Sequence, residues 1–198
     1  MKSFTEVIKL KDGVFYNLEY HQDRVDRTCS QFSIPRFELS NLLKDIPETA
    51  KKGLMKCRIE YGDNINKVEY LPYSFRNIRT VTLVSDNTIE YSYKYADRNQ
   101  LNQLLSSTGC DEMIIVKNGL ITDASAFNLV FESADGLYTP IDCLLKGTKR
   151  QILLDKQTIE EVRITANDFL KYNKVYFINA MVDLEDNICI SIADIAKH

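Results

Sequence analysis

The chain has 198 residues, of which 44% are hydrophobic and 27% are charged, as in an ordinary globular protein. This length allows one domain or two small ones. The net charge of -3 gives no electrostatic footprint for nucleic acid or for an anionic membrane. No apolar run approaches the roughly 18 residues that span a bilayer. We therefore expect neither nucleic acid nor a membrane as a partner.

Cysteine and histidine usage excludes further classes of protein. The five cysteines are scattered and form no CxxC pair, so neither a zinc ribbon nor a disulfide framework is predicted. Only His21 and His198 are available for a histidine-rich metal site, so we expect no metal. The N-terminal stretch MKSFTEVIKLKDG alternates and lacks the continuous apolar segment of a signal peptide. These features favour a cytoplasmic protein with reduced thiols.

The first part of the chain predicts two hairpins with helices between them. Alternating residues on both sides of Asp12-Gly13, a turn dipeptide, indicate the first hairpin. Val25, Cys29 and Phe32 recur at helical spacing and indicate an amphipathic helix. The expected elements are a hairpin over 3–19, a helix over 21–32, a short helix over 36–45, and a second hairpin with strands over 55–61 and 66–73. We expect them to form a small domain over residues 1–74.

The pattern breaks around residues 72–77, which we interpret as a linker, and a larger domain is expected over 75–198. Its expected elements are a strand over 79–85, a helix over 96–107, short strands over 112–140, a helix over 148–155, a strand over 160–165, a helix over 167–172, a strand over 174–180 and a last short helix. Strands dominate and helices are interspersed. The predicted class is therefore α+β with mostly antiparallel pairing.

Lys94 lies between two tyrosines at the end of an extended stretch, immediately before a predicted helix. Aromatic neighbours could desolvate the amine, which lowers its pKa and makes it nucleophilic. A surface lysine at the end of a strand has the same pattern. Asp97 also fits as the N-cap of the following helix, which requires no catalytic role.

Asp123 lies with small residues between two apolar strands, in the stretch TDASAFNL. Small residues beside an acid permit the close approach of a flat ligand, although an Asx turn would have the same sequence. Gly147 and Thr148 open a predicted helix whose free N–H groups form a seat for phosphate. Both are also common helix-starting residues, and the following Lys149 and Arg150 could simply face solvent.

Together and in this order, these pieces resemble the class IV aminotransferases, the fold-type IV enzymes that use pyridoxal 5′-phosphate (PLP). Such enzymes need a lysine for the Schiff base, a carboxylate beside the pyridine nitrogen and a cradle for the phosphate. YHQDRVDR is similar to the family's H-x-x-R-L helix, which implies that Arg24 binds the phosphate. Lys94, ahead of Asp97-Arg98, resembles the Schiff-base lysine before the K-x-x-N/D-R element.

The resemblance continues through the second half of the chain. ITDASAFNLVF resembles the signature E-x-x-x-x-N-[apolar]-F, LYTPIDCLLKGTKRQILL the following strand and phosphate-binding turn, and YFINAMVD a late strand that touches the phosphate. The cofactor-binding residues that it implies are Arg24, Lys94, Asp123, Asn128, Gly147, Thr148, Asn179 and Ala180.

Two departures from the family pattern concern the acid and the N-terminus. The family's acid is usually glutamate, and Asp123 is one methylene shorter, so the ring must sit closer or a water must intervene. Family members usually begin with a further segment containing Y-G-D-G-x-F-E-T, so a shortened N-terminal domain is expected here. Phe4 and Thr5 are then expected to border the substrate pocket. Arg98, where lyase-like members often carry arginine, is a third substrate candidate.

The resemblance implies a two-domain enzyme like D-amino-acid aminotransferase, a homodimer in which Lys94 acts on a small amino substrate. Branched-chain aminotransferase-like transamination and the pyruvate-releasing elimination of aminodeoxychorismate lyase both remain open, with a slight preference for the lyase. Two alternatives stand beside this reading. One is a relic of the family that binds PLP without turnover, and the other is an α+β interaction domain without a cofactor.

Overall fold

The structure is a computed structural model that describes residues 2–195, and it divides into two compact units. The first unit contains the chain up to Phe75 together with Tyr93–Asp97, and the second contains Arg76–Ser92 and the chain from Arg98 onward. The sequence placed one boundary between residues 74 and 75, and therefore placed Lys94 in the second domain. In the structure Tyr93–Asp97 belongs to the first unit, because backbone hydrogen bonds join this segment to the start of that unit's first strand.

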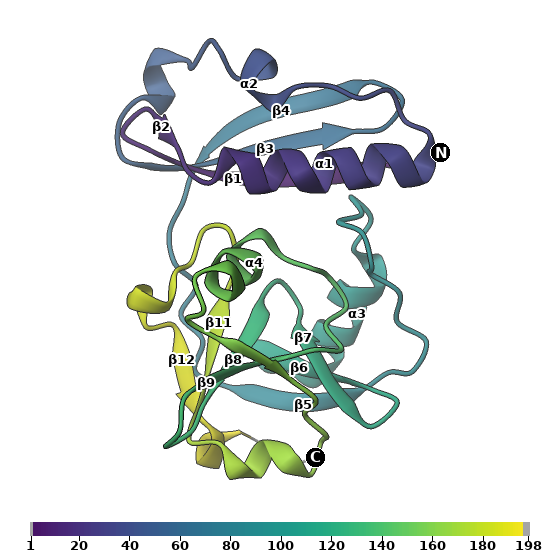
Figure 1. The fold of residues 1–198 in the computed structure, drawn as a ribbon, viewed down its shortest axis with the longest axis vertical. Helices are drawn as coiled ribbons and strands as arrows, with labels where there is room; N and C mark the ends of the chain where they lie inside the picture. Colours follow the sequence, from purple (N-terminus) through teal and green to yellow (C-terminus); the bar gives the residue numbers. More distant parts are fainter. Residues whose placement is uncertain (1, 196–198) are drawn as a thin grey trace. The chain divides into compact units, whose positions relative to one another are not determined.

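The first unit is a four-stranded antiparallel sheet in the order β2-β1-β3-β4, with helix α1 along one face (Figure 1). Its elements are β1 (Phe4–Lys11), β2 (Val14–Phe15), α1 (Leu18–Phe32), α2 (Leu39–Leu42), a 3-10 turn (Glu48–Ala50), β3 (Leu54–Tyr61) and β4 (Ile65–Pro72). Asp12 and Gly13 form the predicted turn, both at positive φ. Helix α1 begins three residues before the expected start, which leaves β2 only two residues long.

The core of the first unit lies between α1 and the sheet. Phe4 and Ile8 of β1 pack there with Val25 and Cys29 of α1 and with Ile59 of β3. Each of these side chains is buried, so the helical and strand periodicities of the sequence meet at one apolar layer.

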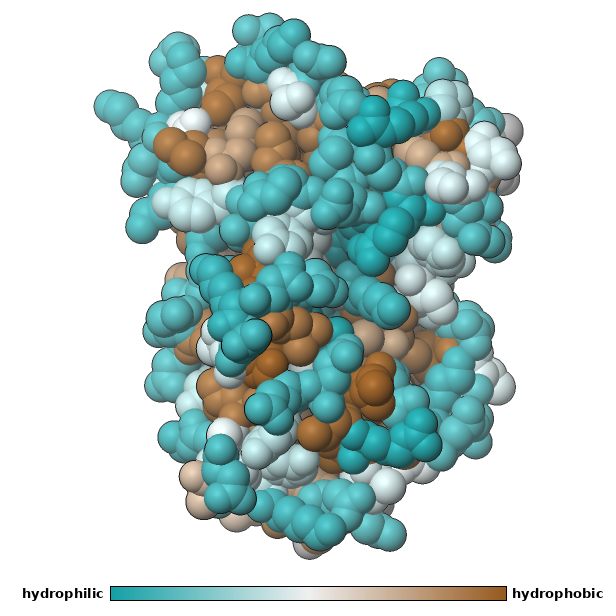
Figure 2. All heavy atoms as spheres, viewed as in Figure 1, coloured by the Kyte–Doolittle hydropathy of each residue, from teal (hydrophilic) through white to brown (hydrophobic). Residues whose placement is uncertain are grey.

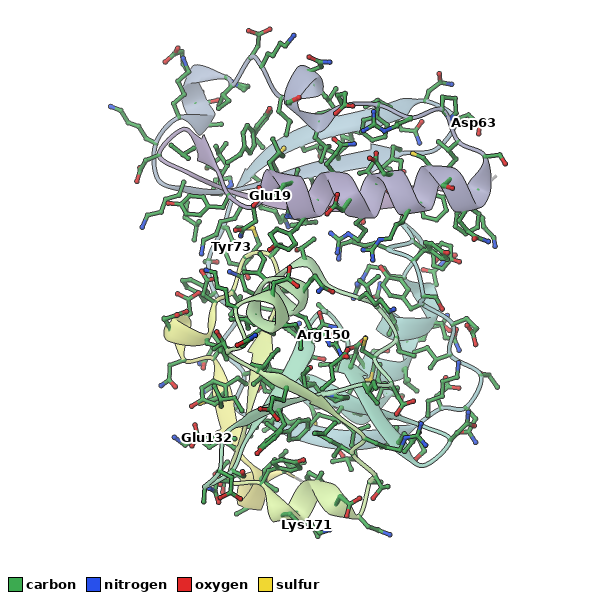
Figure 3. The ribbon with its side chains drawn as sticks, viewed as in Figure 1. Glu19, Asp63, Tyr73, Glu132, Arg150 and Lys171 are labelled. Atoms are coloured by element: carbon green, nitrogen blue, oxygen red, sulfur yellow. The ribbon has the colours of Figure 1, made fainter. Side chains whose placement is uncertain are left out.

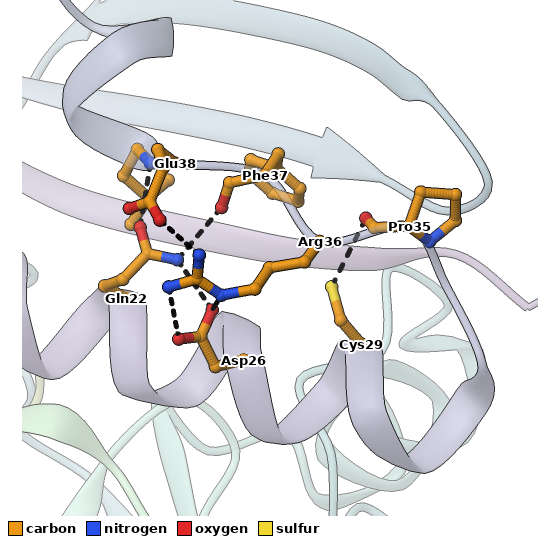
Figure 4. Close-up of polar contacts among 8 residues, drawn as sticks. Gln22, Asp26, Cys29, Pro35, Arg36, Phe37 and Glu38 are labelled. Carbon is orange, nitrogen blue, oxygen red and sulfur yellow. Dashed lines mark hydrogen bonds and ion pairs between the residues drawn. The ribbon is translucent and has the colours of Figure 1, made fainter.

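Polar contacts fix the segment that follows α1 (Figure 4). Gln22 of α1 donates to the carbonyl of Phe37 at 2.9 Å and accepts from the backbone N–H of Leu39 at 2.8 Å. Arg36 reaches back to Asp26 of the same helix at 2.9 Å. These contacts hold α2 close to α1 in a stretch that has little other regular structure.

The second unit contains a three-stranded sheet, β5-β6-β7, and a five-stranded sheet, β10-β9-β8-β11-β12. The strands are β5 (Val81–Ser85), β6 (Glu112–Lys117), β7 (Leu120–Ala124), β8 (Asn128–Glu132), β9 (Leu137–Pro140), β10 (Glu160–Val162), β11 (Lys174–Ile178) and β12 (Cys189–Ser191). The pairs β5–β6 and β9–β10 are parallel, and the other pairs are antiparallel. The predicted α+β class is therefore confirmed.

Two helices complete the second unit, with 3-10 turns at Asp168–Lys171, Leu184–Asp186 and Ile192–Asp194. Helix α3 (Asn99–Thr108) starts after an N-cap at Arg98 and not at Asp97, whereas α4 (Thr148–Asp155) has the bounds expected from the sequence. Leu153 of α4 packs on Val130 and Ile178 of the five-stranded sheet. In this way α4 is fixed beside β8.

Hydrophilic residues cover much of the face seen in Figure 2, with hydrophobic residues visible between them. Within residues 2–195, the large hydrophobic side chains that are exposed are Val14, Tyr16, Leu71, Phe75, Ile141 and Leu170. Among residues 2–195, no helix combines the length and the apolar character that crossing a membrane requires.

Candidate active site

The first unit buries a glutamate on the apolar face of β1. Glu6 shares this face with Phe4 and Ile8 and is fully buried. It contacts Arg24 and His21, which lie one turn apart on α1 and are also buried. A charge in such a position requires direct partners, because burial without them is strongly unfavourable.

The three side chains form a closely paired group. Arg24 donates through Nε to Glu6 Oε1 at 2.8 Å and through Nη2 to Oε2 at 2.6 Å, and His21 Nδ1 lies 2.6 Å from Oε2. Burial raises the pKa of Glu6, but the charge and hydrogen bonds of Arg24, together with His21, lower it to about 2. Glu6 is therefore ionised at neutral pH.

His21 is neutral in this group. Burial lowers its pKa, the hydrogen bond to Glu6 opposes this effect, and the charges of Arg24 and Lys94 lower the pKa further. Since ionised Glu6 only accepts hydrogen bonds, Nδ1 of His21 must carry the proton.

Lys94 lies in a segment that extends the sheet of the first unit. The backbone N–H of Thr5 donates to the Lys94 carbonyl at 2.8 Å, and Phe4 forms an isolated antiparallel bridge with Tyr95. The rings of Tyr93 and Tyr95 lie 4.8 Å and 6.3 Å from the ring of Phe32. Lys94, which lies between these two tyrosines in the sequence, is partly buried.

Phe4 and Thr5, expected at the border of a substrate pocket, are both buried. The Phe4 ring lies 4.7 Å from that of Phe32 and 5.8 Å from that of Tyr61, which makes it part of the core. Thr5 supplies the backbone hydrogen bond to Lys94. Both residues therefore position the segment that carries Lys94.

The second unit buries Asp123 at the end of β7. Asn128, the first residue of β8, donates through Nδ2 to Asp123 Oδ1 and to the Leu145 carbonyl, each at 2.8 Å. The Leu145 N–H donates to Asp123 Oδ2 at 2.8 Å. Burial raises the pKa of Asp123 to about 6, although these two donors and the charge of Arg150 act in the opposite direction. The predicted acid and the predicted asparagine thus form one hydrogen-bonded pair.

Gly147 packs against the side chain of Asn128. A Cβ atom at Gly147 would lie 1.9 Å from Asn128 Oδ1, a separation that excludes every other residue without movement of the asparagine. Gly147 is also the N-cap of α4, where no side chain caps the helix. The first N–H groups of α4 have no side-chain cap, and Thr148 beside them is buried. A helix N-terminus of this kind can bind a phosphate group.

The basic residues of α4 do not simply face solvent. Arg150, labelled in Figure 3, is 2% exposed and donates to Thr139 Oγ1 at 3.2 Å, to the Pro140 carbonyl at 2.9 Å and to Glu161 at 2.6 Å. Lys149 forms an ion pair with Asp183. Both residues attach α4 to the rest of the second unit.

Arg98 and Asn179 donate to the turn between β7 and β8. Arg98 Nη2 donates to the Ser125 carbonyl at 2.7 Å, and its guanidinium lies 5.7 Å from the Tyr91 ring centre. Asn179 Nδ2 donates to the Ala126 carbonyl at 3.1 Å, while its Oδ1 accepts from the backbone N–H of Met181 at 2.9 Å. The next residue, Ala180, is partly buried.

Sequence reasoning missed Glu6 and Glu112, which are both fully buried. Glu6 could have been found, because strand alternation places it on the same face as Phe4, Ile8 and Leu10, where a charge is unexpected. Glu112 opens an apolar strand and its position alone gives no comparable signal.

Residues 3–184 match the family described as amino-transferase class IV. The chain belongs to this family. Class IV aminotransferases are PLP-dependent aminotransferases and lyases, so the resemblance found in the sequence is confirmed at the level of the family.

Three known proteins are similar to this chain in sequence or in structure. An uncharacterised protein of Haemophilus influenzae is 35% identical over 181 residues, which cover 89% of this chain and 96% of that protein. A proposed 4-amino-4-deoxychorismate lyase from Haemophilus somnus 129pt is 33% identical, with a TM-score of 0.84 over 91% of this chain and 97% of the other. The branched-chain amino acid aminotransferase of Escherichia coli shares the fold at 17% identity, with a TM-score of 0.72 over 98% of this chain and 76% of that enzyme.

The residues of this family member fit PLP. In the second unit, Asp123 offers a buried carboxyl for a ring nitrogen, and the N-terminus of α4 offers uncapped N–H groups for a phosphate. In the first unit, Lys94 offers an amine in partly buried surroundings. Each of these groups is of a kind that the family's cofactor requires.

Proposed function

We propose that this protein is a PLP-dependent enzyme that acts on an amino substrate through Lys94, in a pyruvate-releasing elimination like that of 4-amino-4-deoxychorismate lyase. The observation that carries the proposal is the buried carboxyl of Asp123, whose pKa is raised to about 6. Its hydrogen-bond donors, the Leu145 N–H and the Asn128 amide, are both neutral. Buried ionisable groups of this kind concentrate at functional sites, and a pyridinium N–H would provide the direct cationic partner.

When bound, PLP supplies an aldehyde that condenses with amines and a ring that stabilises negative charge at the substrate carbon. Lys94 provides the amine that attaches the cofactor and then moves a proton from the substrate's α-carbon. Asp123, held by Asn128, keeps the pyridine nitrogen protonated. Gly147 and Thr148 bind the phosphate at the start of α4.

Arg24 has a particular place in this proposal. Its charge is balanced by Glu6, to which it donates two hydrogen bonds of 2.6 and 2.8 Å. Its contribution to phosphate binding is therefore mainly directional, through guanidinium N–H groups that Glu6 holds in a fixed orientation.

Support for elimination over transamination comes from the 33% identical relative proposed to be a 4-amino-4-deoxychorismate lyase, which matches over 97% of its length. The branched-chain amino acid aminotransferase described above is more distant, at 17% identity. Arg98 donates through Nη2 to the Ser125 carbonyl, and its role as a substrate-binding residue stays a prediction.

The Lys94→Ala variant tests attachment of the cofactor. Purified wild-type protein, reconstituted with PLP, is expected to be yellow and to carry a pyridoxyl group on Lys94 after borohydride reduction, as mass spectrometry of its peptides would show. Lys94→Ala should lose the visible band and the modified peptide. The matched control is Lys44→Ala, which removes an exposed lysine of the same unit and should keep both. A colourless wild-type protein that PLP cannot reconstitute would overturn the proposal.

The reaction itself is distinguished by its products. The holoenzyme is expected to release pyruvate from 4-amino-4-deoxychorismate. Transfer of the amino group to a keto acid without pyruvate release would identify an aminotransferase. A protein that binds PLP at Lys94 but does neither with a panel of amino acids would be the non-catalytic relic.

A further inference from the structure

Glu112, the first residue of β6, is a fully buried carboxylate outside the set of residues assigned so far. Its Oε1 accepts from the backbone N–H of Ser125 at 3.0 Å and from its own neighbour Met113 at 2.9 Å. Its Oε2 accepts from the Ser125 hydroxyl at 2.8 Å and from Arg76 Nη1 at 3.0 Å. Four donors therefore converge on one side chain, and two of them belong to Ser125.

Ser125 lies in the turn that separates Asp123 from Asn128. The turn is short: the Ala124 N–H donates to the Phe127 carbonyl at 2.9 Å, and β8 begins at the next residue. Any displacement of Ser125 is therefore passed directly to the ends of β7 and β8. Asp123 and Asn128, which must meet at 2.8 Å, lie at those two ends.

A carboxylate suits this position better than a neutral side chain does. Ser125 presents both an N–H and an O–H donor, and only an ionised carboxylate accepts from both while also accepting from Arg76 and Met113. Arg76 balances the charge of Glu112, because its Nη1 lies 3.0 Å from Glu112 Oε2. The Arg76 side chain is 43% exposed, whereas that of Glu112 is 0% exposed. The Arg76 guanidinium also lies 5.8 Å from the Phe127 ring centre, so the same ion pair contacts both ends of the turn.

We propose that Glu112 is a positioning residue that fixes the Ser125–Phe127 turn, and through it the Asp123–Asn128 pair, for the cofactor. The inference rests on the proposed function, because Asp123 is the carboxyl assigned to the pyridine nitrogen. A purely structural role is the weaker explanation, since well-packed apolar residues often replace a buried ion pair without loss of stability. Glu112 instead accepts two hydrogen bonds from Ser125, and these determine where the turn lies.

The test compares Glu112→Gln with the wild-type protein in two measurements. Hydrogen exchange of the Ala124 and Ser125 amides, followed by NMR in the cofactor-free protein, is expected to become faster. PLP affinity, measured by titration of the visible band, is expected to fall by about 10-fold, because the amide nitrogen of glutamine cannot accept the two hydrogen bonds that the replaced carboxylate oxygen accepts. Ser125→Ala removes one donor and leaves the Glu112–Arg76 pair intact, so it tests the same turn independently, with a smaller loss of affinity.

Two controls separate positioning from general loss of stability. Val175→Ala truncates a buried core side chain of the same unit and should lower stability while leaving PLP affinity unchanged. Glu132, labelled in Figure 3, lies at the other end of β8 and accepts a hydrogen bond from the Tyr176 hydroxyl. Glu132→Gln should also leave PLP affinity unchanged.

The outcomes distinguish the two proposals. A wild-type protein that binds no PLP would contradict the proposed function, whatever hydrogen exchange of the Ala124 and Ser125 amides shows. If the wild-type protein binds PLP but neither Glu112→Gln nor Ser125→Ala weakens binding, or if Val175→Ala weakens it equally, Glu112 is not a positioning residue.

Discussion

Asp123 illustrates how one residue can be unfavourable for the fold and still useful for the site. Its carboxyl is 5% exposed, its donors are neutral, and its pKa is raised to about 6 from an ordinary value of 3.8. The carboxyl therefore stays protonated up to a higher pH in the folded protein than in the unfolded chain. Stability contributed by this group is present at low pH and is lost as the pH rises from 3.8 to about 6. A cofactor that carries a positive charge at this carboxyl would remove the penalty.

The Asp123→Asn variant should reveal this penalty in the cofactor-free protein. The ionised carboxyl destabilises the folded state by about 3 kcal/mol above pH 6, as estimated from the size of the pKa shift. The stability of the variant relative to wild type should therefore increase by about this amount between pH 4 and pH 7. Denaturant unfolding at a series of pH values measures the difference. If the free energies of unfolding of the variant and the wild type differ by the same amount at every pH in this range, the pKa of Asp123 is not raised.

At the scale of elements, β1 and α1 are joined by a polar group inside an otherwise apolar layer. Glu6 projects from the core face of β1, and His21 and Arg24 meet it from α1. Because the pKa of Glu6 is lowered from 4.5 to about 2, its contribution to stability is present above pH 4.5 and is lost as the pH falls toward 2. Acid therefore weakens this pairing, whereas it removes the cost of the ionised carboxyl at Asp123.

Glu6→Gln is expected to destabilise the cofactor-free protein by about 3 to 5 kcal/mol, because it leaves the buried charge of Arg24 without its carboxylate. The matched control is Glu60→Gln on β3, whose partly exposed carboxylate pairs with Arg58 at 3.0 Å. Glu60→Gln should lower the free energy of unfolding by less than about 1 kcal/mol. Chemical denaturation at pH 7 compares the two variants, and equal losses would contradict the importance assigned to the buried group.

At the scale of the whole molecule, the chain passes between its two units three times, after Phe75, Ser92 and Asp97. The first unit has one sheet and the second has two, and each unit has its own buried core. The residues assigned to PLP are divided between them, with Arg24 and Lys94 in the first unit and Asp123 in the second. PLP is expected to stabilise the protein because it would bind the folded state and not the unfolded chain.

PLP at about 100 times its dissociation constant should add roughly 2.7 kcal/mol to the stability of the folded protein. For a chain of 198 residues this corresponds to a rise of about 5 to 10 °C in the midpoint of thermal unfolding. Calorimetry with and without PLP measures the shift, and pyridoxine, which lacks the aldehyde and the phosphate, serves as the control ligand. An equal shift with pyridoxine, or none with PLP, would count against the assignment of these residues.

Local chemistry made part of the fold predictable. Asp12-Gly13 and Asn118-Gly119 form turns because these residues tolerate positive φ, and the α4 bounds followed from Gly147 and a short apolar period. The family was identifiable because its motifs are short stretches whose order survives along the chain.

The sequence by itself therefore determined the α+β class and the family, and it indicated Lys94 and Asp123 as candidate site residues. Only the tertiary structure decided that Tyr93–Asp97 joins the first unit, and that Glu6 and Glu112 are buried. The reason is physical: a turn or a helix start depends on a few adjacent residues, whereas a buried charge depends on partners such as Arg24, 18 residues from Glu6, or Arg76, 36 residues from Glu112. Those distances along the chain are closed only by folding.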